Sequence, residues 1–204
     1  MATMTFEPPA LSSPFRVLPL GKLDTYENGA AVVTVGAFPG DAPVGVSLVP
    51  EFRDFYEALN PSVVVPEAHG GSAQLLKDFA GEGLVKLLPA HPGLQDLDVV
   101  VTCVAPVTVK QVGSGSYVLD ADGREFEVSE LAFRMLPLLD GQRTLEEVAV
   151  DVRATVLADR AQRAAMEDIE RDSGQSFDEM LAEEALLLIR ELFDVGVGHF
   201  ERQA

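Results

Sequence analysis

The sequence predicts an α+β protein with two units in tandem, each a small antiparallel sheet with two or three helices. Short runs of alternating apolar and polar residues, separated by glycine-containing turns, predict the strands. Apolar residues at helical spacing behind capping residues predict the helices. A similar order of strands and helices occurs in both halves. The 204 residues are enough for two units of roughly 100 residues each.

The second half opens with three short runs that predict an antiparallel meander. Residues 107–112 are β-branched at alternate positions, and 117–119 resume the pattern after a Gly-Ser break. Residues 124–128 alternate again, after a turn that ends in Gly123. Turn residues between short alternating runs are typical of hairpins, so one three-stranded sheet is expected here.

Two helices are predicted after this sheet. Ser129 is a suitable N-cap for a helix over 130–139, and Gly141 follows as the stop. Thr144 and Glu147 have the spacing of a capping box, in which each side chain accepts from the other residue's backbone N–H. Apolar residues recur behind this box at helical spacing and predict an amphipathic helix: Leu145, Val148, Ala149, Val152 and Val156.

A second capping box, at Ser176 and Glu179, opens a helix that is expected to run to about Phe193. Residues 196–200 are predicted to form a short terminal strand. The polar and acidic segment 158–174 lies between the last two helices, and we expect a solvated, partly helical insertion there.

The first half repeats this order in reduced form, without a clear middle helix. We expect a flexible arm over 1–14, a degenerate unit over 15–90 and a complete unit over 96–204, with a linker at 90–93. Pro50 occupies a favoured helix-start position. The elements expected in the first unit are strands over 15–20, 30–37, 44–48 and 84–88 and helices over 51–59 and 72–80.

Three strands, a helix with a glycine stop, a capped helix, a third helix and a short strand make the winged-helix order. The stretch from Tyr117 to Val148, centred on Asp140-Gly141-Gln142-Arg143-Thr144, resembles the PqqD-like domains, also called RiPP recognition elements. The resemblance covers roughly 107–200. The acidic insertion at 158–174 departs from the compact pattern of that family.

The resemblance implies a peptide-binding function. In that family the leader of a ribosomal precursor peptide adds as a strand to the edge of the sheet, against the last helix. Carried over to this chain, the receiving strand is 124–128 and the facing helix is 186–193. The residues then expected to bind peptide are Arg124, Phe126, Val128, Leu186, Leu187, Arg190 and Phe193.

The apolar run 186–189 supports a contact surface on this helix, because four consecutive apolar positions span about 300° of a helix. The core of a small unit covers only one side of such a helix. The first unit, a partner protein or a peptide could cover the rest. Arg190 could pair with an acidic leader residue, or with Glu183, Glu191 or Asp194 of its own chain.

The net charge of −18, from 15 basic and 33 acidic residues, disfavours nucleic acid and anionic membranes as partners. Such acidity serves solubility, or it attracts a basic peptide or protein. No stretch reaches the roughly 20 apolar residues that span a bilayer, and the first 14 residues lack the basic start of a secretory signal. A single cysteine, Cys103, is expected to be a small buried hydrophobe and indicates a cytoplasmic protein.

No catalytic residue, metal ligand set or cofactor is expected, because the three histidines are far apart and no catalytic or nucleotide-binding motif occurs. The resemblance to PqqD-like domains then implies a non-catalytic accessory protein that presents a precursor peptide to a modifying enzyme, in a heterodimer. By analogy alone, that partner could be a DUF692-type iron oxidase of a methanobactin-like pathway. The alternatives are a winged-helix transcriptional regulator, a protein–protein adaptor or a small acidic enzyme. The regulator is disfavoured, because Arg190 is the sole basic residue of helix 177–193.

Overall fold

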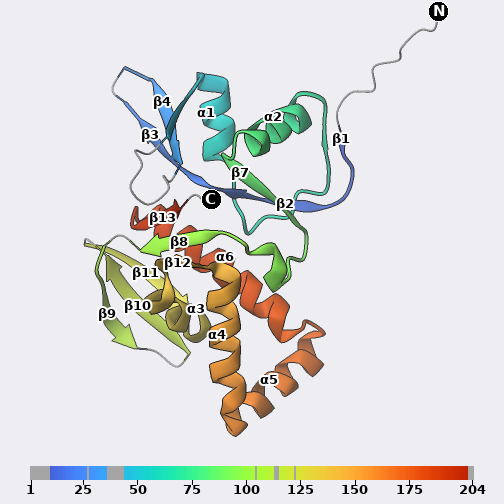
Figure 1. Ribbon diagram of the computed structural model, residues 1–204, viewed down its shortest axis with the longest axis vertical. Helices are drawn as coiled ribbons and strands as arrows, with labels where there is room; N and C mark the ends of the chain where they lie inside the picture. Colours follow the sequence, from blue (N-terminus) through green and yellow to red (C-terminus); the bar gives the residue numbers. More distant parts are fainter. Residues whose placement is uncertain are drawn as a thin grey trace, which may run out of the picture.

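The computed structural model describes residues 10–26, 28–35, 44–103, 105–112, 115–121 and 123–201. These residues form an α+β fold with several small antiparallel sheets, as the sequence predicts. The elements of the first half lie together, and those of the second half lie together beside them (Figure 1). Four elements lie on the side of the second half that faces the first (Figure 1): helix α6 (Phe177–Asp194) and strands β8 (Val100–Cys103), β12 (Asp140–Thr144) and β13 (Gly198–Glu201).

The first half contains a meander and a two-stranded sheet around Phe79. The rings of Phe52, Phe55 and Tyr56 pack edge-on against Phe79, with centroids 5.8–6.2 Å apart. The order in the meander is β3-β4-β5, and β2 pairs with β7. The elements are β2 (Phe15–Pro19), β3 (Gly21–Thr25), β4 (Ala31–Val35), β5 (Val44–Leu48), α1 (Pro50–Glu57), α2 (Gly70–Gly81) and β7 (Val85–Pro89).

Most predicted elements of this half are confirmed, and two features differ. Within the predicted arm at 1–14, the described end contains a short strand, because β1 (Ala10–Leu11) pairs with β6 (Ala68–His69). Residues 1–9, and residues 36–37 of the predicted second strand, lie outside the described part of the chain. Strand β3 was not predicted, because Leu23 is the only large apolar residue in it and the strand exists through pairing with β4.

The second half contains the predicted meander, with order β11-β10-β9. Both predicted capping boxes form, at Thr144–Glu147 and at Ser176–Glu179. The elements are β8 (Val100–Cys103), β9 (Val107–Val112), β10 (Ser116–Ala121), β11 (Arg124–Ser129), α3 (Glu130–Met135), η2 (Leu136–Leu138), β12 (Asp140–Thr144), α4 (Leu145–Ala158), α5 (Arg160–Ser173), α6 (Phe177–Asp194) and β13 (Gly198–Glu201).

A second sheet in this half was not predicted. Strand β8 lies between β12 and β13, so the apolar run that contains Cys103 is the central strand of three. Cys103 itself is only half-buried, and its thiol donates to the carbonyl oxygen of Ala105 across 3.3 Å. The predicted helix stop at Gly141 is part of β12.

The acidic insertion is more regular than predicted. It forms helix α5 from Arg160 to Ser173, and none of the residues of this helix is buried. The carboxylate of Asp159 accepts hydrogen bonds from the backbone N–H groups of Ala161 and Gln162 at the start of the helix. Gly174, with a φ of 72°, ends the helix in the left-handed conformation.

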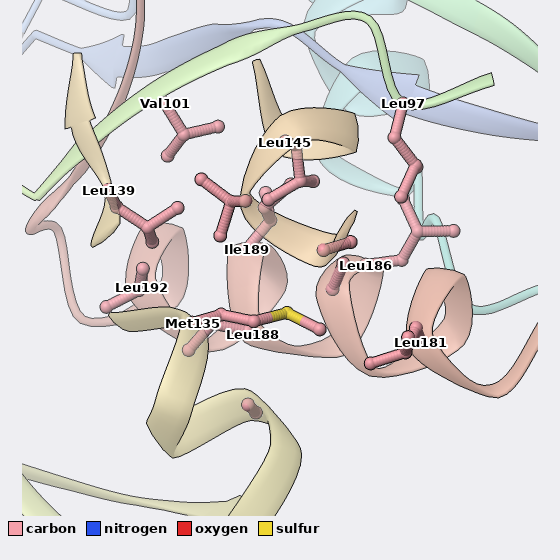
Figure 2. Packing of buried hydrophobic residues seen from close by; sticks show 14 of the residues in the cluster. Leu97, Val101, Met135, Leu139, Leu145, Leu181, Leu186, Leu188, Ile189 and Leu192 are labelled. Atoms are coloured by element: carbon pink, nitrogen blue, oxygen red, sulfur yellow. The ribbon is translucent and has the colours of Figure 1, made fainter. Parts of the chain in front are cut away.

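Helix α6 is buried on most of its circumference and forms the centre of the core. Its buried side chains include Leu181, Leu186, Leu188, Ile189 and Leu192. Figure 2 shows these five residues with Met135 of α3 and Leu145 of α4. The same core cluster includes Leu18 of β2 and Leu88 of β7, so the first half provides part of the cover that the apolar run of α6 requires.

Candidate functional site

The strand predicted to receive a peptide, β11, is an edge strand. Its residues pair with β10 from Arg124↔Ala121 to Ser129↔Ser116, and none of the described strands pairs with its other side. Arg124 and Ala121 enclose two residues, so they are the hydrogen-bonded pair that closes a hairpin. Because hydrogen-bonded and non-hydrogen-bonded pairs alternate along an antiparallel ladder, Glu125 and Glu127 turn their backbone N–H and C=O groups outward.

A cavity of about 310 Å³ lies between this edge and helix α6. We call it the β11–α6 groove. It has an apolar floor and a rim of carboxylates. Its lining residues are Gly115 and Ser116 of the β10 turn, Glu127, Val128 and Ser129 of β11, Ala132 of α3, and Glu184, Leu187, Leu188 and Glu191 of α6.

Hydrogen bonds fix α6 to both ends of β11. At one end the hydroxyl of Ser129 donates to Glu184 Oε2 across 2.6 Å and accepts from the N–H of Ala132. At the other end Arg124 Nη1 donates to the carbonyl oxygen of Val195 across 3.3 Å. The helix therefore runs antiparallel to β11, and the groove between them is pre-formed.

The electrostatics of the groove are one-sided. Glu127, Glu184 and Glu191 line it, and none of its lining residues is lysine or arginine. The chain as a whole carries a net charge of −18, so the long-range field has the same sign as the groove. A cationic ligand is favoured by both.

The structure places only some of the predicted peptide-binding residues in this groove. Leu187 lines it and is 40% exposed. Val128 also lines it, although most of its side chain faces the core. Phe126 and Leu186 are 6% and 1% exposed, so their side chains belong to the core. The expectation that these two side chains contact a peptide is corrected.

The other three predicted residues have different surroundings. Arg124 closes one end of the groove through its bond to Val195. Arg190 and Phe193 line a separate cavity of about 250 Å³ against Leu18 and residues 57–61 of the first half. Arg190 also pairs with Asp194 across 3.5 Å, one of the partners that the sequence offers it. These two residues therefore lie where the two halves meet and do not line the groove.

Sequence reasoning missed most of the residues that line the groove, including its three glutamates and the serine that holds one of them: Glu127, Glu184, Glu191 and Ser129. The signal for the helix wall was present, because positions 184, 187, 188 and 191 form one stripe of an α-helix. For the strand, the signal was the alternation of polar and apolar residues. It places the side chain of Glu127 on the opposite face of the sheet from those of Phe126 and Val128.

Another cavity, larger than the β11–α6 groove, lies at the other edge of the meander. It has a volume of about 1050 Å³ and is mainly apolar, between β9, α3, η2 and α4. Cys103 lines it, and burial raises the pKa of this thiol, so the thiol is a weak nucleophile at neutral pH.

No group of three or more histidine, cysteine, aspartate or glutamate side chains in the described part of the chain is arranged to hold a metal ion. Within the same residues, no helix has the length and apolar character to cross a membrane. The chain matches no protein-family model, no curated protein and no solved structure.

Proposed function

We propose that this chain is a non-catalytic accessory protein that binds the leader segment of a ribosomal precursor peptide in the β11–α6 groove. It presents that peptide to a partner modifying enzyme in the cytoplasm, as one subunit of a heterodimer. The observation that carries the proposal is a free sheet edge, at β11, beside a pre-formed groove walled by α6.

The groove suits binding by strand addition. The outward N–H and C=O groups of Glu125 and Glu127 provide main-chain hydrogen bonds to an added strand, and these are independent of the peptide's sequence. Every second side chain of that strand points into the groove. There it meets Leu187, Leu188 and Val128, which select apolar residues.

The order of the elements supports the finer description of the fold as two winged-helix-like units in tandem. The second unit has three strands, β9 to β11, followed by α3, α4 and α6, with α5 inserted before the last helix. This is the order of the PqqD-like domains that the sequence resembles. The first unit has its own core around Phe79, which supports its description as a separate unit.

The test compares two variants of the tagged, full-length protein, with short peptides and proteins identified by mass spectrometry after capture from the native host. Leu187→Glu places a carboxylate in the groove. Val150→Glu is the matched control, because Val150 is 45% exposed on α4 and does not line the groove. We expect a precursor peptide to be recovered with the wild type and the control and to be lost with Leu187→Glu. Equal recovery with both variants would exclude this groove.

A further inference from the structure

The β11–α6 groove continues into a second cavity that the inserted helix α5 creates. This cavity has a volume of about 860 Å³, and we call it the α5 pocket. Its apolar surface comes from three helices: Leu131 of α3, Met166 and Ile169 of α5, and Met180 and Leu187 of α6. Ile169 is the one branched apolar residue of α5, and 42% of it is exposed at this pocket.

The two cavities share a wall. Both the groove and the α5 pocket are lined by Glu184 and Leu187 of α6. Glu184 is held in place by the hydroxyl of Ser129, at the end of β11 nearest to α3. The end of β11 at Ser129 and the α5 pocket therefore lie on either side of the same two residues of α6, Glu184 and Leu187.

Carboxylates border the α5 pocket as they border the groove. Glu179, Glu183 and Glu184 line it, and the only side chain of the lining that can carry a positive charge is His91. Arg16 neutralises Glu183. We call the groove and the α5 pocket together the trough. Its apolar surface is flanked along its length by the acidic residues of both cavities: Glu127, Glu191, Glu179, Glu183 and Glu184.

Charge separates the candidate occupants of this trough. A second copy of the chain would bring another net charge of −18 toward the same acidic surface, which disfavours self-association there. Residues 1–9 contain one charged side chain, Glu7, and no basic residue, so this segment of the chain does not complement the trough. A basic peptide complements it.

We infer that the trough binds a basic amphipathic peptide segment, one part of which pairs with β11 while the adjoining part places apolar side chains in the α5 pocket. The inference rests on the proposed function and specifies its ligand: apolar residues for the floor, with lysine or arginine between them for the rim. Met166 and Met180 suit such a site, because their unbranched side chains adapt to different apolar partners. The acidic insertion is then the element that selects among leaders.

The test starts with a display library of random linear dodecapeptides, selected at physiological salt against the full-length protein. The selected peptides are expected to be net basic with interspersed apolar residues. Affinity of the consensus peptide is then measured for the wild type, for Ile169→Asp and for Val150→Asp. The bound peptide is expected to bury the Ile169 side chain, and Ile169→Asp removes this aliphatic contact. We therefore expect Ile169→Asp to raise Kd by about tenfold or more, and Val150→Asp to leave Kd unchanged.

Hydrogen exchange at the amides of β11, with and without the consensus peptide, separates this inference from the proposed function. Protection of β11 together with the loss of affinity in Ile169→Asp supports both. Protection of β11 with equal affinity in the two variants overturns the α5 pocket and leaves the groove. Selected peptides that are not basic also overturn the inference. Absence of protection at β11 overturns the proposed function, and the inference with it.

Discussion

Arg16 of β2 and Glu183 of α6, which are 167 positions apart in the chain, form an ion pair with Arg16 Nη2 2.5 Å from Glu183 Oε1. Arg16 is 5% exposed, and its other nitrogens donate to the carbonyl oxygens of Ala90, Pro61 and Ser62. The guanidinium therefore joins the first half, the segment between the halves and the central helix of the second half.

Removal of the Glu183 carboxylate should destabilise the whole chain. Glu183→Ala leaves a buried guanidinium with carbonyl partners only, and we expect a loss of about 1–3 kcal/mol in the free energy of unfolding. Urea unfolding measures it. The matched control is Asp168→Ala, which removes the exposed pair with Arg171 and should cost less than about 1 kcal/mol. Equal losses would show that the Arg16 pair has no special role.

Tyr56 should be equally important within the first half. Its hydroxyl accepts from the N–H of Gly21 and lies 3.0 Å from the carbonyl oxygens of Gly21 and Leu84, which links α1, β3 and the turn before β7. Tyr56→Phe leaves these buried groups without their partner, and we expect a loss of about 1–3 kcal/mol in urea unfolding. Tyr26→Phe, at an exposed tyrosine, is the control.

The same residue predicts alkaline sensitivity. Burial raises the pKa of Tyr56 from its ordinary value of 10.0 to about 12. The folded protein keeps this phenol neutral, whereas the unfolded chain ionises it, so the stabilisation is complete below pH 10 and is lost as the pH rises toward 12. Stability measured across this range should fall less steeply in Tyr56→Phe. Parallel curves for the two proteins would contradict the prediction.

The cap of α6 predicts a sensitivity to acid. Two hydrogen bonds to the Glu179 carboxylate hold the pKa of Glu179 below its ordinary value of 4.5. The larger effect comes from the backbone N–H of Ser176 and the smaller one from its hydroxyl. A lowered pKa in the folded state gives a stabilisation that is present above pH 4.5 and is lost as the pH falls through the folded value. Glu179→Gln keeps an acceptor but does not titrate. The pH dependence of its unfolding below 4.5 should therefore be weaker than that of the wild type.

Proline scanning distinguishes the outer edge of β11 from its inner side. Phe126→Pro removes a ladder N–H and a core side chain, and we expect it to abolish cooperative unfolding. Glu127→Pro removes an outward N–H at an edge, where proline is tolerated, and one carboxylate of the groove, so the protein should stay folded and lose peptide affinity. Circular dichroism and binding of the consensus peptide measure the two effects. If the Phe126→Pro variant folds, the backbone N–H of residue 126 is not required for pairing with β10, which contradicts the pairing of Phe126 with Leu119.

Local signals were sufficient for much of the second half. Both capping boxes join residues three apart, and the meander strands follow each other through short turns, so neighbouring residues contain the information. Strand β8 could not be predicted in this way, because it pairs with β13, which lies far away in sequence. Its apolar residues are equally compatible with a buried helix or a loop.

The site was predictable in its elements but not in its side chains. The free edge of β11 and the helix 186–193 follow from the resemblance, yet the face of each element depends on what packs behind it. Phe126 alternates with Glu127, and only the position of α3 and α6 decides that Phe126 faces the core. Arg190 and Phe193 lie outside the groove because the first half packs near that side of α6, a contact with no signature in the sequence.

The shared core around α6 also has a consequence for synthesis. Leu18 and Leu88 emerge from the ribosome early, but the helix that completes their cluster is translated only after the whole of α5. The first half can build its own Phe79 cluster during translation, while the side that faces α6 stays uncovered until then. Nascent chains that end before residue 177 should consequently be the species that require chaperones, and α6 should be the segment whose arrival releases them.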